Sequence, residues 1–215
     1  MNLNTKRELF KRIVQLYIEN RHSIYCYHGY SNQALQINAD LATNKRKGKT
    51  GIKQILNVLE PYSFIKANSL NEFNNYKFMY ILPDKGDKEL FDKILKDKNI
   101  RFQFRKEREN KNPDLLIKIG DEIFIVEHKL TNGSGGTQNA GINEIIRFIS
   151  HSEINPKVHY VSCLQGNVFR KLNQQNEKSK IQHTSLIDSL KMNPQNFFLN
   201  NNGFSQLILD YIRNR

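Results

Sequence analysis

Residues 112–130 read NPDLLIKIGDEIFIVEHKL and contain two short apolar runs joined by a turn. The runs 115–119 and 123–126 are rich in residues that favour strands, and Gly120-Asp121 between them is a dipeptide typical of tight turns. We therefore expect an antiparallel β-hairpin here. The second run has no polar residue, which favours a strand that is buried on both faces.

Charged residues gather at one end of this hairpin. Asp114 precedes the first run, and Glu127, His128 and Lys129 follow the second. Because side chains alternate along a strand, Glu127 and Lys129 should share one face and His128 should lie on the other. Burying an unpaired carboxylate is costly, and a metal ion or a cationic partner offsets that cost. Two interpretations stay open: a metal site, or solvated strand-end residues that pair with each other.

This arrangement resembles the PD-(D/E)XK nuclease superfamily, in its E-x-K form, over roughly residues 100–165. The matching residues are Pro113, Asp114, Glu127 and Lys129. The motif is short, but it gains specificity when it falls across a hairpin that a helix follows. The resemblance implies a restriction-endonuclease-like core, in which helices flank a mixed β-sheet.

The same resemblance implies roles for individual residues. Asp114 and Glu127 would hold Mg²⁺, for which Mn²⁺ is expected to substitute, together with the backbone carbonyl of His128. Lys129 would orient or polarise the attacking water. The middle position of the motif is usually apolar, so His128 departs from the pattern, and we expect its side chain to face away from the metal.

Composition points to a polyanionic partner. The 215 residues carry a formal net charge of +12, which favours binding to nucleic acid, and we expect double-stranded DNA. No apolar run reaches spanning length and no signal pattern begins the chain, so we expect a cytoplasmic protein without membrane contact. The two cysteines, Cys26 and Cys163, form no metal-binding spacing and are expected to be free thiols.

Residues 1–82 show three helix-type patterns followed by two β-type runs, at 62–65 and 76–81. This order resembles a winged helix-turn-helix with a terminal hairpin. We therefore expect a mainly helical DNA-binding region at 1–82 and a nuclease domain at 83–215, which together make an α+β or mixed α/β protein. An accessory helical subdomain with a solvated basic loop is the alternative. The basic residues expected to contact DNA phosphates are Lys45, Arg46, Lys47, Lys49 and Lys53.

Further candidate residues lie on either side of the hairpin. Glu89, on a helix expected after Pro83, is a candidate additional acid for the metal, although a solvated helix face explains it more simply. Beyond the hairpin, a glycine-rich loop is expected at 131–139. Its Gln138 and Asn139 carry amides suited to adenine edges, or they cap the next helix. Arg101–Arg105 alternates as a half-exposed strand would.

Taken together, these patterns predict a Mg²⁺-dependent, sequence-specific endonuclease of the type II restriction class. A double-strand cut needs two active sites, so we expect a homodimer. A DNA repair or junction nuclease shares the motif and needs no sequence-reading region. A non-catalytic winged-helix regulator is the other alternative, but the presence of Asp114, Glu127 and Lys129 together argues against it.

Overall fold

The protein is described by a computed structural model that covers residues 51–104, 111–131, 136–166 and 176–213, with eight helical residues between 5 and 16. The chain divides into two compact units, Met1–Gly48 and Lys49–Arg215. Most of the first unit, including the expected DNA contacts Lys45 to Lys47, lies outside the described residues. Among the described helices, none has both the length and the apolar composition needed to cross a membrane.

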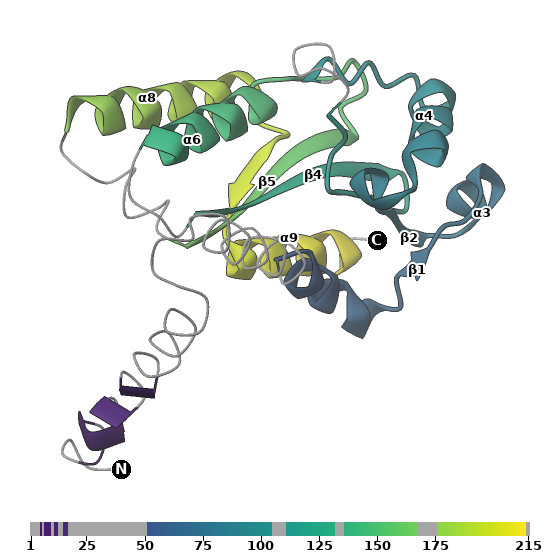
Figure 1. Cartoon of the computed structure of the whole chain (residues 1–215). Helices are drawn as coiled ribbons and strands as arrows, with labels where there is room; N and C mark the ends of the chain where they lie inside the picture. Colours follow the sequence, from purple (N-terminus) through teal and green to yellow (C-terminus); the bar gives the residue numbers. More distant parts are fainter. Residues whose placement is uncertain are drawn as a thin grey trace, which may run out of the picture. The chain divides into compact units, whose positions relative to one another are not determined.

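A six-stranded mixed sheet forms the centre of the second unit, with strands in the order β1-β2-β3-β4-β5-β6 (Figure 1). Strands β2, β3 and β4 are antiparallel neighbours. Strand β1 runs parallel to β2. Strands β4, β5 and β6 run parallel to one another. The strands are β1 (Ile65–Lys66), β2 (Phe78–Ile81), β3 (Leu115–Ile119), β4 (Glu122–Thr131), β5 (Val158–Gly166) and β6 (Phe197–Leu199).

Helices cover both faces of the sheet, so the predicted mixed α/β class with a helix-flanked sheet is confirmed (Figure 1). One face packs against α4 and α6, with α8 beside α6, and the other packs against the helical residues 51–59 and α9. The helices are residues 51–59, η1 (Glu60–Tyr62), α3 (Leu70–Asn75), η2 (Pro83–Lys85), α4 (Lys88–Asp97), α6 (Gly136–Ile149), α8 (Glu177–Met192) and α9 (Asn201–Arg213).

The predicted hairpin is present as β3 and β4. Its register runs from Leu115 opposite Val126 to Ile119 opposite Glu122, and Gly120 takes the left-handed conformation, with φ 62°, that the turn requires. Alternate residues of these strands enter the two apolar clusters on the two faces of the sheet. Both strands are therefore buried on both sides, as the apolar run in 123–126 indicated.

The expected winged-helix hairpin is wrong. Strands β1 and β2 are parallel, because α3 lies between them and carries the chain back before β2 begins. Ser69 caps α3 by accepting a hydrogen bond from the Glu72 amide, and Phe73 anchors the helix in the core. Strand β2 also pairs with β3, so no domain boundary falls at residues 82 and 83; the chain divides at 48 and 49 instead.

The strand expected at Arg101–Arg105 is also wrong for the residues that the structure describes there. Phe102 and Phe104 are both buried, and Phe102 has φ 40°, outside the β region. The amides of Arg101 and Phe102 donate to the Glu153 carboxylate at 2.9 and 3.0 Å. The carboxylate therefore accepts the two backbone hydrogen bonds that a neighbouring strand would otherwise accept. The rings of Phe102 and Phe104 enter the core although the segment pairs with no strand in the described part of the chain.

Candidate active site

The hairpin brings Asp114 and Glu127 together. Continuing the register of β3 and β4 by one residue places Asp114 opposite Glu127. The amide of His128 donates a hydrogen bond to Asp114 Oδ2 at 2.8 Å, which fixes the carboxylate against the end of β4. Glu127 is almost fully buried, with 4% of its surface exposed. Two carboxylates thus lie side by side where β3 begins, next to the middle of β4.

Two lysines and a third carboxylate complete this group. Lys111 donates to Glu127 Oε1 and, at 2.5 Å, to Glu144 Oε1 of helix α6. Lys129 shares the face of Glu127 and donates to Glu144 Oε2 at 3.0 Å. We call these five residues, Lys111, Asp114, Glu127, Lys129 and Glu144, the carboxylate–lysine cluster. It joins β4 to α6 through charge-assisted hydrogen bonds.

Burial and like charge act strongly on the carboxylates of the cluster. Burial, followed by the charge of Asp114, raises the pKa of Glu127 to about 7, although Lys111 opposes the shift. Burial also raises the pKa of Asp114; the His128 amide opposes this shift, and the nearby Asp84 adds to it. Burial opposes the charge of Glu144 as well, but the hydrogen bonds from Lys111 and Lys129 outweigh it and lower its pKa to about 2.

The cluster offers oxygen atoms of the kind that Mg²⁺ prefers. Glu127 Oε2 is buried and has no hydrogen-bond partner among the described residues. An orphaned carboxylate oxygen beside a second carboxylate fits a hard cation, and the His128 carbonyl lies between Glu127 and Lys129 in the chain. Within the described ranges, no group of three or more His, Cys, Asp or Glu side chains is arranged around a metal position. The fit therefore rests on Asp114, Glu127 and this carbonyl.

His128 faces the opposite side of the sheet, as the alternation along β4 predicts. A Cβ atom placed on Gly51 would lie 2.2 Å from His128 Cε1, so the imidazole ring packs directly against the glycine backbone. Gly51 belongs to the helical residues 51–59, which cover the face away from α6. The side chain of His128 is thus separated from the cluster by the sheet itself.

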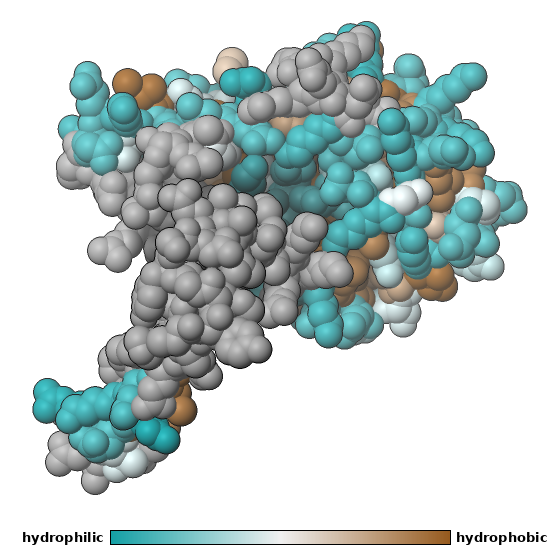
Figure 2. Space-filling model, viewed as in Figure 1, coloured by the Kyte–Doolittle hydropathy of each residue, from teal (hydrophilic) through white to brown (hydrophobic). Residues whose placement is uncertain are grey.

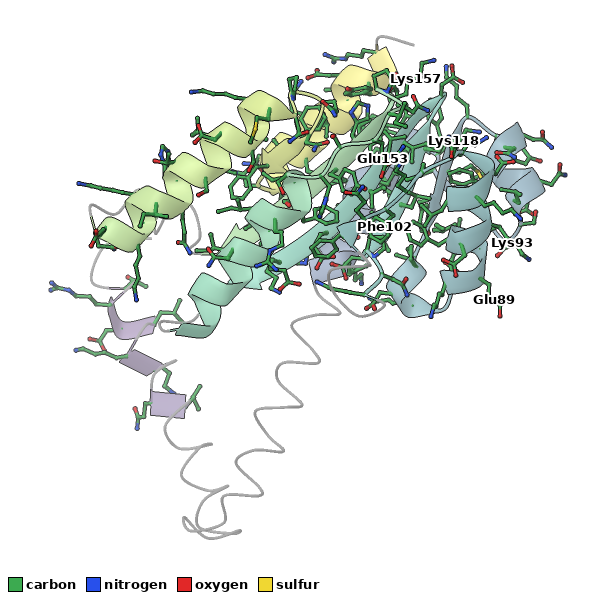
Figure 3. The ribbon with its side chains drawn as sticks, turned by 90° about the horizontal axis from the view of Figure 1, so that it is seen from above. Glu89, Lys93, Phe102, Lys118, Glu153 and Lys157 are labelled. Atoms are coloured by element: carbon green, nitrogen blue, oxygen red, sulfur yellow. The ribbon has the colours of Figure 1, made fainter. Side chains whose placement is uncertain are left out.

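Glu89, the predicted additional acid, does not join the cluster. It is exposed and lines a surface pocket of about 360 Å³ with Asn68, Asp87 and Lys93. Figure 3 shows Glu89 and Lys93 near the outer edge of this unit, apart from Phe102. The physical reason is the orientation of α4, which turns Phe91 and Ile94 into the core and leaves Glu89 outside.

The predicted DNA contacts are described only in part. Lys53 is exposed on the helical residues 51–59, whereas Lys45, Arg46, Lys47 and Lys49 lie outside the described residues. Helix α6 begins at Gly136, so Gln138 and Asn139 fall in its first turn and not in a loop, and their side chains lie outside the description. These contacts remain predictions.

Sequence reasoning missed Glu144 and the pairing of Lys111 with Glu127 and Glu144. Glu144 had a usable signal, since it is the sole acid in the sequence of α6 and lies beside the apolar stripe of Ile142, Ile145 and Ile146. The pairing of Lys111 had no such signal in the sequence, because Lys111 ends a charged stretch that contains several lysines and arginines. Asp84, in η2 just before α4, lies near enough to Asp114 to raise the pKa of that carboxyl.

The described surface in the view of Figure 2 is mostly hydrophilic, with hydrophobic residues in small separate areas. Cys163 is a buried free thiol, as predicted, and burial raises its pKa to about 12, which disfavours the thiolate form that a nucleophile requires. The carboxylate–lysine cluster is therefore the best-supported site in the described part of the chain. Comparisons with protein-family models, with curated proteins and with solved structures found no match for this chain.

Proposed function

We propose that this protein is a Mg²⁺-dependent endonuclease that hydrolyses phosphodiester bonds in double-stranded DNA, of the type II restriction class. The observation that carries the proposal is the meeting of Asp114 with the buried Glu127, whose Oε2 has no partner among the described residues, on the face that also holds Lys129. The formal net charge of +12 supports a polyanionic substrate. The mixed sheet flanked by helices is compatible with a restriction-endonuclease-like core.

Each residue of the cluster has a role in this proposal. Asp114, Glu127 and the His128 carbonyl would hold Mg²⁺ or Mn²⁺, which supplies positive charge against the phosphate that is hydrolysed. The His128 amide holds one oxygen of Asp114, so the carboxylate is oriented before any ligand arrives. Lys129 would stabilise negative charge that develops on the phosphate. Glu144 fixes the Lys129 ammonium through its 3.0 Å hydrogen bond.

DNA recognition in this proposal comes from elements flanking the cluster. The basic residues Lys45, Arg46, Lys47, Lys49 and Lys53 would contact phosphates, and Gln138 and Asn139 would read base edges. Helix α6 starts at Gly136 and carries Glu144, so the same helix holds the two amides and one carboxylate of the cluster. A homodimer would present one such element to each half of a palindromic site. Sedimentation on a cleaved duplex would test this: one protomer per duplex would contradict the dimer.

Digestion of a plasmid of known sequence tests the proposed activity. With Mg²⁺ we expect discrete fragments whose sequenced ends share one short site, and with EDTA we expect intact plasmid. Cutting only at branches or damaged positions would favour a repair or junction nuclease instead. Binding without cleavage in Mg²⁺ and in Mn²⁺, on linear, supercoiled and branched DNA, would favour the non-catalytic regulator. Full activity in EDTA would contradict metal dependence.

A further inference from the structure

Lys111 lies between two carboxylates of the cluster. Its ammonium contacts carboxylates from two different elements, Glu127 of β4 and Glu144 of α6. The side chain of Lys111 is 32% exposed, whereas those of Glu127 and Glu144 are 5% and 14% exposed. The lysine therefore reaches inward from a more open position and neutralises charge on two more deeply buried groups.

This contact conflicts with metal binding by Glu127. The proposed metal needs the Glu127 carboxylate beside Asp114, but the ammonium of Lys111 already occupies Glu127 Oε1. An ammonium and a divalent ion at one carboxylate would repel each other, and the ion carries the larger charge. Lys129 presents no such conflict, because its ammonium contacts Glu144 Oε2 and not Glu127.

We propose that Lys111 is an exchangeable internal cation, which neutralises the Glu127 carboxylate through Oε1 in the free protein and leaves it when a divalent ion binds the same carboxylate. The inference rests on the proposed metal-dependent function and adds a step to it. In the absence of metal, Lys111 keeps the buried carboxylates of Glu127 and Glu144 compensated, so the site stays assembled. On metal binding, the same lysine gives up its hydrogen bond to Glu127 and turns toward solvent.

Metal titration without DNA tests the exchange directly. Lys111→Met removes the competing cation, and we expect it to tighten Mn²⁺ binding by about tenfold, which corresponds to about 1.4 kcal/mol. Lys129→Met is the matched control: it removes one charge from the same cluster without freeing Glu127, so its effect should be clearly smaller. Titrations at about pH 7.5 and about pH 8.5 distinguish competition by Lys111 from competition by a proton on Glu127, because proton binding weakens as pH rises.

Ammonium-detected NMR of the unaltered protein provides a second, independent readout. The Lys111 signal, assigned by its loss in Lys111→Met, should shift or broaden when Mg²⁺ is added. Lys118 serves as an internal reference, because its ammonium is buried and donates to the carbonyls of Phe73 and Asn74, at 2.6 and 2.7 Å. We expect its signal to stay unchanged.

The outcomes separate the exchange from the function on which it rests. Tighter binding in Lys111→Met, or a Mg²⁺-dependent change of the Lys111 signal alone, supports the exchange. If the unaltered protein binds metal but neither effect is seen, Lys111 is a permanent ion-pair partner and the exchange is overturned, while the nuclease proposal stands. If neither the protein nor the variant binds Mg²⁺ or Mn²⁺, with or without DNA, the metal-dependent function itself is overturned.

Discussion

Strand β4 carries two glutamates, Glu122 at its first residue and Glu127 near its middle, and the two carboxylates differ in how they are compensated. At the amino end, Glu122 Oε2 and His159 Nε2 lie 2.8 Å apart, and His159 Nδ1 lies 2.7 Å from the Gln195 carbonyl. Near the middle of β4, Glu127 keeps one buried oxygen without a partner among the described residues. A buried carboxylate that is fully compensated does not by itself indicate a functional site, whereas the partnerless oxygen of Glu127 supports the proposed metal site.

The sharpest test of this contrast is the same substitution made separately at the two glutamates of β4. We expect Glu127→Gln to lower the DNA cleavage rate by about a thousandfold or more, because an amide is a much weaker metal ligand than a carboxylate. Glu122→Gln should stay within about threefold of the unaltered protein, since it removes no ligand. Single-turnover cleavage at saturating Mg²⁺ measures both. Equal losses of cleavage rate in the two variants would contradict the distinction between Glu127 and Glu122.

The pH dependence of the free energy of unfolding should also distinguish Glu127 from Glu122. Glu127 has its pKa raised from 4.5 to about 7, so between these values the folded protein holds a proton that the unfolded chain has lost. Its contribution is full below about pH 4.5, declines as pH rises and is gone above about pH 7, a change of roughly 3 kcal/mol. Glu144 acts in a lower window, since its stabilisation is lost as pH falls from 4.5 through about 2.

Denaturant unfolding of the metal-free protein at several pH values between about 4.5 and about 8 measures this contribution. In Glu127→Gln the decline should flatten, because the amide does not titrate. A decline of the same size in the variant would mean that another group causes it. Glu122→Gln, which keeps Glu127, should retain the decline and serves as the control.

Substitution of Lys129 tests which face of β4 takes part in the proposed reaction. We expect Lys129→Ala to lower the cleavage rate by about a hundredfold, which is typical of the loss of one electrostatic group near the reacting phosphate. His128→Ala should cost much less, because the His128 ring packs against Gly51 on the opposite face. Lys157→Ala is a charge control at the far end of the strands, where Lys157 pairs with the exposed Asp121 at 3.0 Å. Similar losses for the first two variants would contradict the face assignment.

The smallest expected effect is structural. Glu122→Gln should lower the free energy of unfolding by about 2 kcal/mol, because His159 is buried, with 4% exposed, and would lose a charged hydrogen-bond partner. Glu127→Gln at neutral pH should have little effect or none, since it removes a buried charge that is only partly compensated. Urea unfolding at about pH 7 compares them. A larger loss in Glu127→Gln would mean that the cluster is primarily structural.

Local patterns predicted the parts of this fold that local physics controls. The hairpin followed from two strand-type runs around Gly120-Asp121, and the opposite orientations of Glu127 and His128 followed from alternation. The helix expected after Pro83 is α4. Helix α8 has a weaker local signal, because its inward-facing residues include the polar Ser179 and Gln182.

The site was predictable only where its residues are neighbours in the hairpin. Asp114, Glu127 and Lys129 lie on two adjacent strands, so their proximity follows from one turn. Lys111 and Glu144 meet through the packing of α6 on the sheet, a long-range contact that no local spacing encodes. The predicted antiparallel pairing of β1 and β2 was wrong for the same reason, because the path of α3 between them determines their relative direction.

The contact of Gly51 with His128 has a consequence for how the sequence can vary. Even a methyl group at position 51 would overlap the imidazole ring, so alanine there requires either a smaller residue at position 128 or a displaced helix. Gly51→Ala should therefore be harmful alone and tolerated together with His128→Ala, a case of compensatory epistasis. In an alignment of related chains, the two positions should covary in size: the bulkier the residue between the glutamate and the lysine of the motif, the stricter the requirement for glycine at position 51.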